Sequence, residues 1–228
     1  LNLPNNGSLD KRHWQLFMKR LRKLSGRKNI RYYHCGEYGE KSNRPHYHAC
    51  LFNFDFEDKV IHSIENGHRL YTSKFLERTW GLGFCTIGEV TFESAAYVAR
   101  YILKKQTGKA ALSKYTRWDP ETGEITAELQ PEYVTMSRAS GIGKNWFLKY
   151  RSDVYPNDYV VVRGHKCRPP QYYDELYKKE KPVTAKKLKT ERRLEAEKYS
   201  ADQTPERLKV RENVQKARLQ MLPRKMEG

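Results

Sequence analysis

Apolar residues recur at helical spacing in two stretches of the chain. In residues 8–24 one helical face collects the large apolar side chains, namely Trp14, Phe17, Met18, Leu21 and Leu24. Ser8 is the predicted N-cap of this helix and Gly26 its predicted C-cap. Residues 94–105 show a second stripe, with Ser94 near its start. Shorter helices are predicted over residues 57–66, 73–79 and 144–150.

Two neighbouring segments have the composition of strands. Residues 30–38 and 46–52 are rich in aromatic and β-prone side chains, and the polar turn between them predicts an antiparallel hairpin. Further strands are predicted over residues 83–90, 133–136 and 159–163. Because strands and helices do not alternate regularly, the order favours an α+β fold with helices packed on one face of the sheet.

Three parts of the chain differ from this pattern. Residues 106–132 are polar and turn-rich, which predicts a surface insertion. Residues 174–228 are charge-rich with thinly spaced leucines, which predicts a basic tail of extended helix or disorder. We therefore expect one domain over residues 1–173 followed by this tail. Residues 1–8 have the character of a loop end, and the opening strand is expected to be missing from this chain.

Composition narrows the class of partner. Lys and Arg number 44 against 27 Asp and Glu, a net charge of +17, which favours a polyanion such as nucleic acid. Sixteen tyrosines, four tryptophans and eight phenylalanines offer rings on which unpaired bases stack. Apolar runs are far shorter than the roughly 20 residues of a membrane helix. Four scattered cysteines without a C-x-x-C pair argue against a zinc ribbon or disulfide framework and favour a reducing, intracellular setting.

A His-x-His pair is the first candidate for chemistry. His46 and His48 lie two residues apart on a predicted strand, so both side chains share a face and can converge on one metal ion. Strand alternation makes Glu37 the preferred third ligand over Glu40. Such a nitrogen and oxygen site suits Mg²⁺ or Mn²⁺ acting as a Lewis acid on a phosphate. Cys50 shares the histidine face, so zinc is the competing interpretation, although a small core cysteine is the simpler one.

A pair of tyrosines one helical turn apart is the second candidate. Tyr97 and Tyr101 share a face of the predicted helix, where they either fill the core or act as nucleophiles. Nearby cations, which include Arg100, Lys104 and Lys105, favour the phenolate form that attack requires. Two phenols beside cations and a metal suit two successive phosphoryl transfers to tyrosine.

The two motifs together resemble the two-tyrosine class of HUH endonucleases. The wider text, in residues 36–48, 95–101, 136–143 and 161–173, is similar to the replication initiators of microviruses, in particular the gokushovirus-like branch. The resemblance extends from the start of the chain to about residue 177. It implies a ferredoxin-like or RRM-like HUH fold with a central antiparallel sheet.

The resemblance also implies a function. Members of the family nick origin DNA, join one tyrosine to the 5′-phosphate, and leave a 3′-OH that primes rolling-circle synthesis; the second tyrosine then allows joining. By motif, His46 and His48 would bind the metal, and Tyr97 and Tyr101 would be the nucleophiles. Lys104 or Lys105 would steady the phenolate or the scissile phosphate. Arg100 stands where related enzymes often have lysine, which keeps the charge but not a lysine-specific role.

These implications define the expected partners. Single-stranded or supercoiled origin DNA is the expected substrate, and the candidate DNA contacts are Arg44, Arg100, Lys19 and Arg22. A host helicase or polymerase is a candidate further partner, no membrane is involved, and the expected location is the cytoplasm of a bacterial host. The alternatives are a non-catalytic single-stranded DNA-binding protein, a plasmid or transposon HUH nickase, and a zinc-stabilised structural site.

Overall fold

The structure is a computed structural model that describes residues 7–39, 42–65, 67–101, 105–138 and 140–221. It divides into two compact units, Leu1–Ile142 and Gly143–Gly228. Elements of the first unit are α1 (Lys11–Ser25), β1 (Arg31–Tyr38), β2 (Pro45–Phe52), β3 (Val60–Glu65), β4 (His68–Thr72), α2 (Lys74–Trp80), α3 (Phe92–Arg100), α4 (Lys109–Tyr115), β5 (Thr116–Trp118), β6 (Ile125–Glu128) and β7 (Tyr133–Met136). Those of the second are α5 (Lys144–Val154), β8 (Val160–Val162), β9 (His165–Cys167), α6 (Gln171–Glu180), α7 (Pro182–Glu197), the 3-10 helix η3 (Ser200–Gln203) and α8 (Pro205–Met221).

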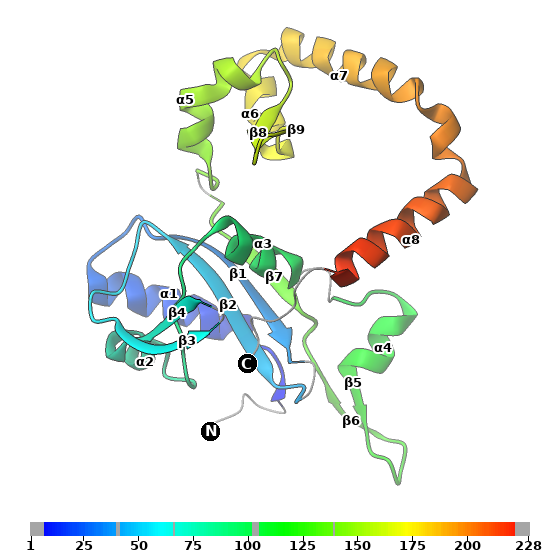
Figure 1. The fold of residues 1–228 in the computed structure, drawn as a ribbon. Coiled ribbons are helices and arrows are strands. Elements are labelled where there is room, and N and C mark those ends of the chain that lie inside the picture. Colours follow the sequence, from blue (N-terminus) through cyan, green and yellow to red (C-terminus); the bar gives the residue numbers. More distant parts are fainter. Residues whose placement is uncertain (1–6, 40–41, 66, 102–104, 139, 222–228) are drawn as a thin grey trace. The chain divides into compact units, whose positions relative to one another are not determined.

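A three-stranded antiparallel sheet, in the order β2-β1-β7, is the centre of the first unit (Figure 1). The predicted hairpin is confirmed, because β1 and β2 pair along their whole length from Arg31 opposite Phe52 to Tyr38 opposite Pro45. The predicted strand over residues 133–136 is β7, which pairs with the other edge of β1. The α+β class is therefore correct.

Helices cover both faces of this sheet, so the expectation that they pack on one face is wrong (Figure 1). On one face Trp14 of α1 stacks on His34 of β1, with ring centroids 3.9 Å apart. On the other face Val98 of α3 is buried among Cys35 of β1 and Cys50 of β2. Because successive strand residues point to opposite faces, the near-continuous apolar and aromatic run in β1 requires a cover on each side.

Helix α1 begins two residues later than the sequence predicts. Asp10, not Ser8, is the N-cap, and its carboxylate accepts the backbone N–H of Arg12 at 2.7 Å. The Ser8 hydroxyl instead accepts the backbone N–H of Gln130 at 2.9 Å. The predicted C-cap Gly26 is confirmed in the left-handed region, at φ 67°.

The predicted helix over residues 94–105 is α3, which begins earlier, at Phe92, and ends at Arg100. Thr91 caps it in a reciprocal arrangement with Ser94, in which each side chain accepts the other residue's backbone N–H. Residues 102–104 lie outside the described part of the chain. The cap fixes where the helix starts, and hence the turn on which its tyrosines lie.

Several local predictions are wrong. The helix predicted over residues 57–66 is strand β3, which forms a hairpin with β4. The strand predicted over residues 83–90 is reduced to one bridge, between Ile87 and Tyr71. Within residues 106–132 lie a short helix, α4, and the hairpin of β5 and β6. The strand predicted over residues 159–163 is confirmed as β8, but β9 follows it.

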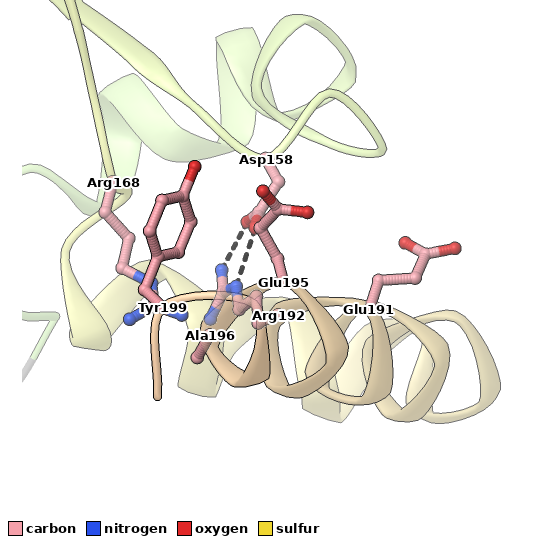
Figure 2. A pocket seen from close by; sticks show the side chains of 7 residues that line it. All are labelled: Asp158, Arg168, Glu191, Arg192, Glu195, Ala196 and Tyr199. Atoms are coloured by element: carbon pink, nitrogen blue, oxygen red, sulfur yellow. Dashed lines mark hydrogen bonds and ion pairs between the residues drawn. The ribbon is translucent and has the colours of Figure 1, made fainter. Parts of the chain in front are cut away.

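The second unit has a small core of its own, formed by Phe147, Val154, Tyr155 and Leu188. Arg192 of α7 donates to the carboxylates of Asp158 and Asp174, which joins this helix to α6 and to the turn before β8 (Figure 2 shows the Asp158 side). The described part of the predicted tail is helical. The predicted domain of residues 1–173 stays a prediction, and its end falls within α6. No helix of the described chain is long and apolar enough to cross a membrane.

Candidate functional site

The candidate ligands lie together on the α3 face of the sheet. In the register of β1 and β2, Glu37 is opposite His46 and Cys35 is opposite His48. Directly opposed residues of an antiparallel pair point to the same side, so the juxtaposition predicted from strand alternation is what the structure contains. Tyr47, between the two histidines, points to the other face and approaches α1.

Glu37 and His48 are in direct contact. Glu37 is fully buried, and its Oε1 lies 2.9 Å from Nε2 of His48, which is partly exposed. A carboxylate in this position orients the imidazole and favours its charged form. The His46 and His48 rings are 6.5 Å apart between centroids, and His46 is the more exposed of the two.

The backbone of Gly39 forms one wall of the His46 position. A Cβ on Gly39 would lie 2.7 Å from Cε1 and 3.1 Å from Nδ1 of His46. The turn after β1 is held by two hydrogen bonds between backbone groups, from Gly39 N–H to the carbonyl of Arg44 and from Asn43 N–H to the carbonyl of Gly39. Glycine at residue 39 therefore allows the ring to lie against the main chain.

Both candidate tyrosines reach the same face. Tyr101, at the C-cap of α3, is buried, and its ring stacks on that of His48 with centroids 4.5 Å apart. Tyr97 meets Tyr101 edge-to-face at 5.0 Å and is partly exposed. The guanidinium of Arg100 lies 5.7 Å from the centre of the Tyr97 ring. Sequence positions 37, 48, 97 and 101 thus form one continuous cluster.

The donor chemistry of this cluster suits a divalent cation, although the arrangement is not that of a preformed cage. No group of three His, Cys, Asp or Glu side chains in the described chain is arranged to hold a metal ion. The nearest set is the His48–Glu37 pair with His46 beside it, and the His46 ring lies against Gly39, where a Cβ would fill the space. Two imidazoles and a carboxylate are a fitting donor set for Mg²⁺ or Mn²⁺.

Cys50 does not behave as a ligand. It is buried against Val98 and Tyr101, and burial raises the pKa of its thiol. A thiol that keeps its proton is a poor partner for zinc, so the core interpretation of Cys50 is the better one.

The other predicted site residues are scattered. Lys105 is exposed after α3, and Arg44 is exposed in the turn before β2. Lys19 is exposed on α1, which covers the opposite face from the tyrosines, and Arg22 there donates to the carbonyl of Ile30 at 3.0 Å. Glu40 and Lys104 lie outside the described residues. The roles of all these residues stay predictions.

A buried polar cluster was not predicted. The carboxylate of Glu132 is buried and accepts hydrogen bonds from Lys114 and from the Tyr115 hydroxyl. That hydroxyl also accepts the backbone N–H of Gln106 at 2.9 Å. Burial and the Glu132 carboxylate raise the pKa of Tyr115 to about 12. The cluster anchors the chain that leaves the tyrosine helix, and nothing in the local sequence pattern distinguishes it from a solvated insertion.

Comparison with known proteins agrees with this picture. Residues 1–106, which include every residue of the cluster, match a family model described as replication-associated protein, of the ORF2 type. The class is therefore that of replication-associated proteins.

Three curated phage proteins are similar to the chain. It is 36% identical over 185 residues to replication-associated protein VP4 of Bdellovibrio phage phiMH2K, a match that covers 76% of this chain and 54% of that protein. It is 36% identical over 177 residues to replication-associated protein ORF2 of Spiroplasma virus 4, which covers 74% and 50% respectively. A third relative, replication-associated protein ORF4 of Chlamydia phage 1, is 27% identical over 179 residues, covering 75% and 42%.

The chain is thus a homologue of the replication-associated proteins of small gokushovirus-like phages, which confirms the resemblance found from its motifs. It spans about half the length of the curated relatives it matches. No solved structure matches it, and the specific HUH ferredoxin-like fold stays a prediction.

Proposed function

We propose that this chain is a tyrosine nickase and strand transferase of the HUH type that initiates rolling-circle replication of a small single-stranded DNA phage. The observation that supports this most strongly is the stacking of Tyr101 on His48, whose Nε2 is held by the buried carboxylate of Glu37. A general DNA-binding protein has no need of a phenol, an imidazole and a buried carboxylate in one cluster.

The first chemical step is attack of a tyrosine Oη on the scissile phosphorus. A P–Oη bond forms, the P–O3′ bond breaks, and the 3′ oxygen leaves as a hydroxyl after it takes up a proton. The His48–Glu37 pair is placed to exchange that proton, because a carboxylate at 2.9 Å stabilises imidazolium. The phosphotyrosine ester keeps the energy of the broken phosphodiester, so no external energy source is needed for rejoining.

The second tyrosine serves the termination step. After a round of synthesis, Oη of the other tyrosine attacks the regenerated origin, and the new 3′-OH then attacks the first phosphotyrosine. A P–O3′ bond forms, the P–Oη bond breaks, and a circular strand is released. Tyr97 and Tyr101 are 5.0 Å apart between ring centroids, close enough to address the same position in turn.

His46, His48 and Glu37 would hold the divalent cation. When bound, it would polarise a phosphate oxygen as a Lewis acid. The chain's own cations have a separate task. Arg100, beside Tyr97, favours the phenolate and attracts the phosphate backbone, and Lys105 and Arg44 are candidates for the same contact.

Origin DNA, single-stranded or supercoiled, is the proposed substrate, and the infected bacterial cell is the proposed place of action. The excess of positive charge supports a polyanionic substrate. A host helicase or polymerase as a further partner stays a proposal.

The test is covalent attachment. Purified protein is incubated with single-stranded DNA of its own phage genome and Mn²⁺, and the products are separated on a denaturing gel. We expect a protein–DNA adduct that each Tyr→Phe variant diminishes, that Tyr97→Phe/Tyr101→Phe abolishes, and that chelator prevents. Tyr71→Phe, a change in a tyrosine of β4 away from the cluster, is the matched control and should leave the adduct intact.

An absent adduct with undiminished DNA binding in chelator would support the non-catalytic binding alternative. Adduct formation on plasmid or transposon origins in preference to the phage genome would favour a nickase of another element.

A further inference from the structure

We infer that a second site, on the opposite side of strand β2 from the catalytic cluster, receives an unpaired nucleobase of the bound DNA strand. This inference rests on the proposed function, since it names a subsite for the same substrate. The site is a cavity of about 270 Å³ in the first unit. Its lining residues come from α1 and from the C-terminal end of α2, namely His13, Leu16, Arg20, Arg78, Trp80, Gly81 and Leu82.

The Trp80 ring is held in place. Its edge-to-face neighbours are Phe17 of α1, at 5.7 Å between ring centroids, and Tyr47 of β2, at 5.2 Å. Arg20 fixes the end of α2 by donating to the carbonyls of Thr79, at 2.7 Å, and Trp80, at 3.0 Å. An aromatic ring that is already ordered loses little entropy when a base stacks on it.

The composition of the lining suits a base attached to a phosphate chain. The cavity lining contains two guanidinium groups, an imidazole and an indole and has no acidic member. Arg78 is exposed and contacts the Phe75 ring at 5.9 Å, so its charge is open to the backbone of DNA. His13 is partly engaged, with Nδ1 3.2 Å from the Tyr47 hydroxyl and Nε2 3.7 Å from the Asp10 carboxylate. The volume lies just below the range of about 300–1,000 Å³ typical of drug-sized ligands, which suits a single planar base.

Tyr47 connects this cavity to the catalytic strand. It lies between His46 and His48 in sequence, yet its ring faces α1, so its hydroxyl reaches His13 and its ring reaches Trp80. In the described sheet β2 is an edge strand, because its pairing partner is β1. A DNA strand whose phosphate lies at the histidines can pass around this edge and place a base a few nucleotides away beside Trp80.

A larger cavity in the second unit has the wrong chemistry for this role. It measures about 450 Å³, and its lining includes the carboxylates of Asp158, Glu191 and Glu195 (Figure 2). Arg192, which also lines it, is engaged by Asp158. Carboxylates repel phosphates, so we assign the base to the Trp80 cavity.

The test separates base stacking from backbone attraction. Affinities are measured in chelator by fluorescence anisotropy for a labelled oligothymidylate of about twelve nucleotides and for an abasic strand of equal length. Trp80→Ala should weaken binding of the oligothymidylate by about 5- to 150-fold and leave the abasic strand unchanged. Trp80→Phe should recover most of the loss. Arg78→Ala should weaken both strands equally, whereas Lys74→Ala, at the other end of α2, is the matched control that should alter neither by as much.

Each outcome decides the point. Equal affinities for wild-type protein and Trp80→Ala, with Trp80→Phe also unchanged, would overturn the inference. So would an equal loss for both strands in Trp80→Ala, since that is the result of a disturbed fold. Chelator keeps these measurements independent of nicking: loss of the covalent adduct with a Trp80 effect intact would overturn the proposed function alone.

Discussion

Gly39→Ala tests whether the position of the His46 ring matters for nicking. The added Cβ would lie 2.7 Å from Cε1 and 3.1 Å from Nδ1 of His46, whereas non-bonded carbon atoms prefer about 3.5–4.0 Å. The ring must therefore move by about 1 Å. Displacement of a reacting or positioning group by about 1 Å costs on the order of 100-fold in rate. We expect the single-turnover rate of nicking to fall about 10- to 100-fold.

The same substitution should scarcely affect stability. His46 is exposed, so its side chain can swing away without opening the core. The φ angle of Gly39 lies outside the left-handed region, so alanine fits the backbone there. The free energy of unfolding should change by less than about 1 kcal/mol. Nicking rate and chemical denaturation are measured side by side.

Gly88→Ala is the matched control. Its Cβ would meet Leu70 at 3.7 Å, an ordinary contact, so nicking and stability should both stay near wild type. If Gly39→Ala nicked at the wild-type rate, or if it unfolded the protein, the argument that Gly39 positions His46 would be refuted.

Three further predictions concern other groups. Burial lowers the pKa of His34 to about 3, so this residue should stabilise the fold above pH 6.5 and cease to do so as pH falls from 6.5 towards 3; chemical denaturation should show a shallower acid-side decline in His34→Phe, and an unchanged slope would contradict this. The pKa of Tyr115 is raised to about 12, so stability should fall as pH rises from 10 to 12, and Tyr115→Phe should reduce that fall in the same assay. Arg192→Ala removes the cation between Asp158 and Asp174 and should destabilise the second unit by about 1–3 kcal/mol, with hydrogen exchange faster there and unchanged in β1, whereas Arg193→Ala, an exposed neighbour, should have little effect.

Much of the catalytic cluster was predictable because it depends on short-range geometry. A strand repeats every two residues, so His46 and His48 had to share a face, and Glu37 shared it once the hairpin register was set. The spacing of Tyr97 and Tyr101 likewise follows from one helical turn. Contact between the two motifs was not predictable from period alone, since it depends on α3 packing over the side of the sheet opposite to α1.

The wrong predictions have physical causes. In residues 57–66 the apolar residues Val60, Ile61 and Ile64 have spacing that a helix also allows, and the pairing of β3 with β4 decided between the two. Residues 83–90 have strand-like composition, yet Phe84 and Val90 are exposed and one bridge joins the segment to β4. At the start of α1 both Ser8 and Asp10 are good caps, and the Ser8 hydroxyl is engaged by Gln130, far along the chain.

The most direct test of the central claim is to identify the residue that carries DNA. The protein–DNA adduct formed with single-stranded phage DNA and Mn²⁺ is digested with nuclease and protease, and the peptides are sequenced by mass spectrometry. We predict a nucleotide remnant on the tyrosines of the α3 peptide, Tyr97 or Tyr101, and on the remaining one when the other is changed to phenylalanine. A remnant on any other residue, or an unmodified α3 peptide in protein that has nicked DNA, would contradict the account.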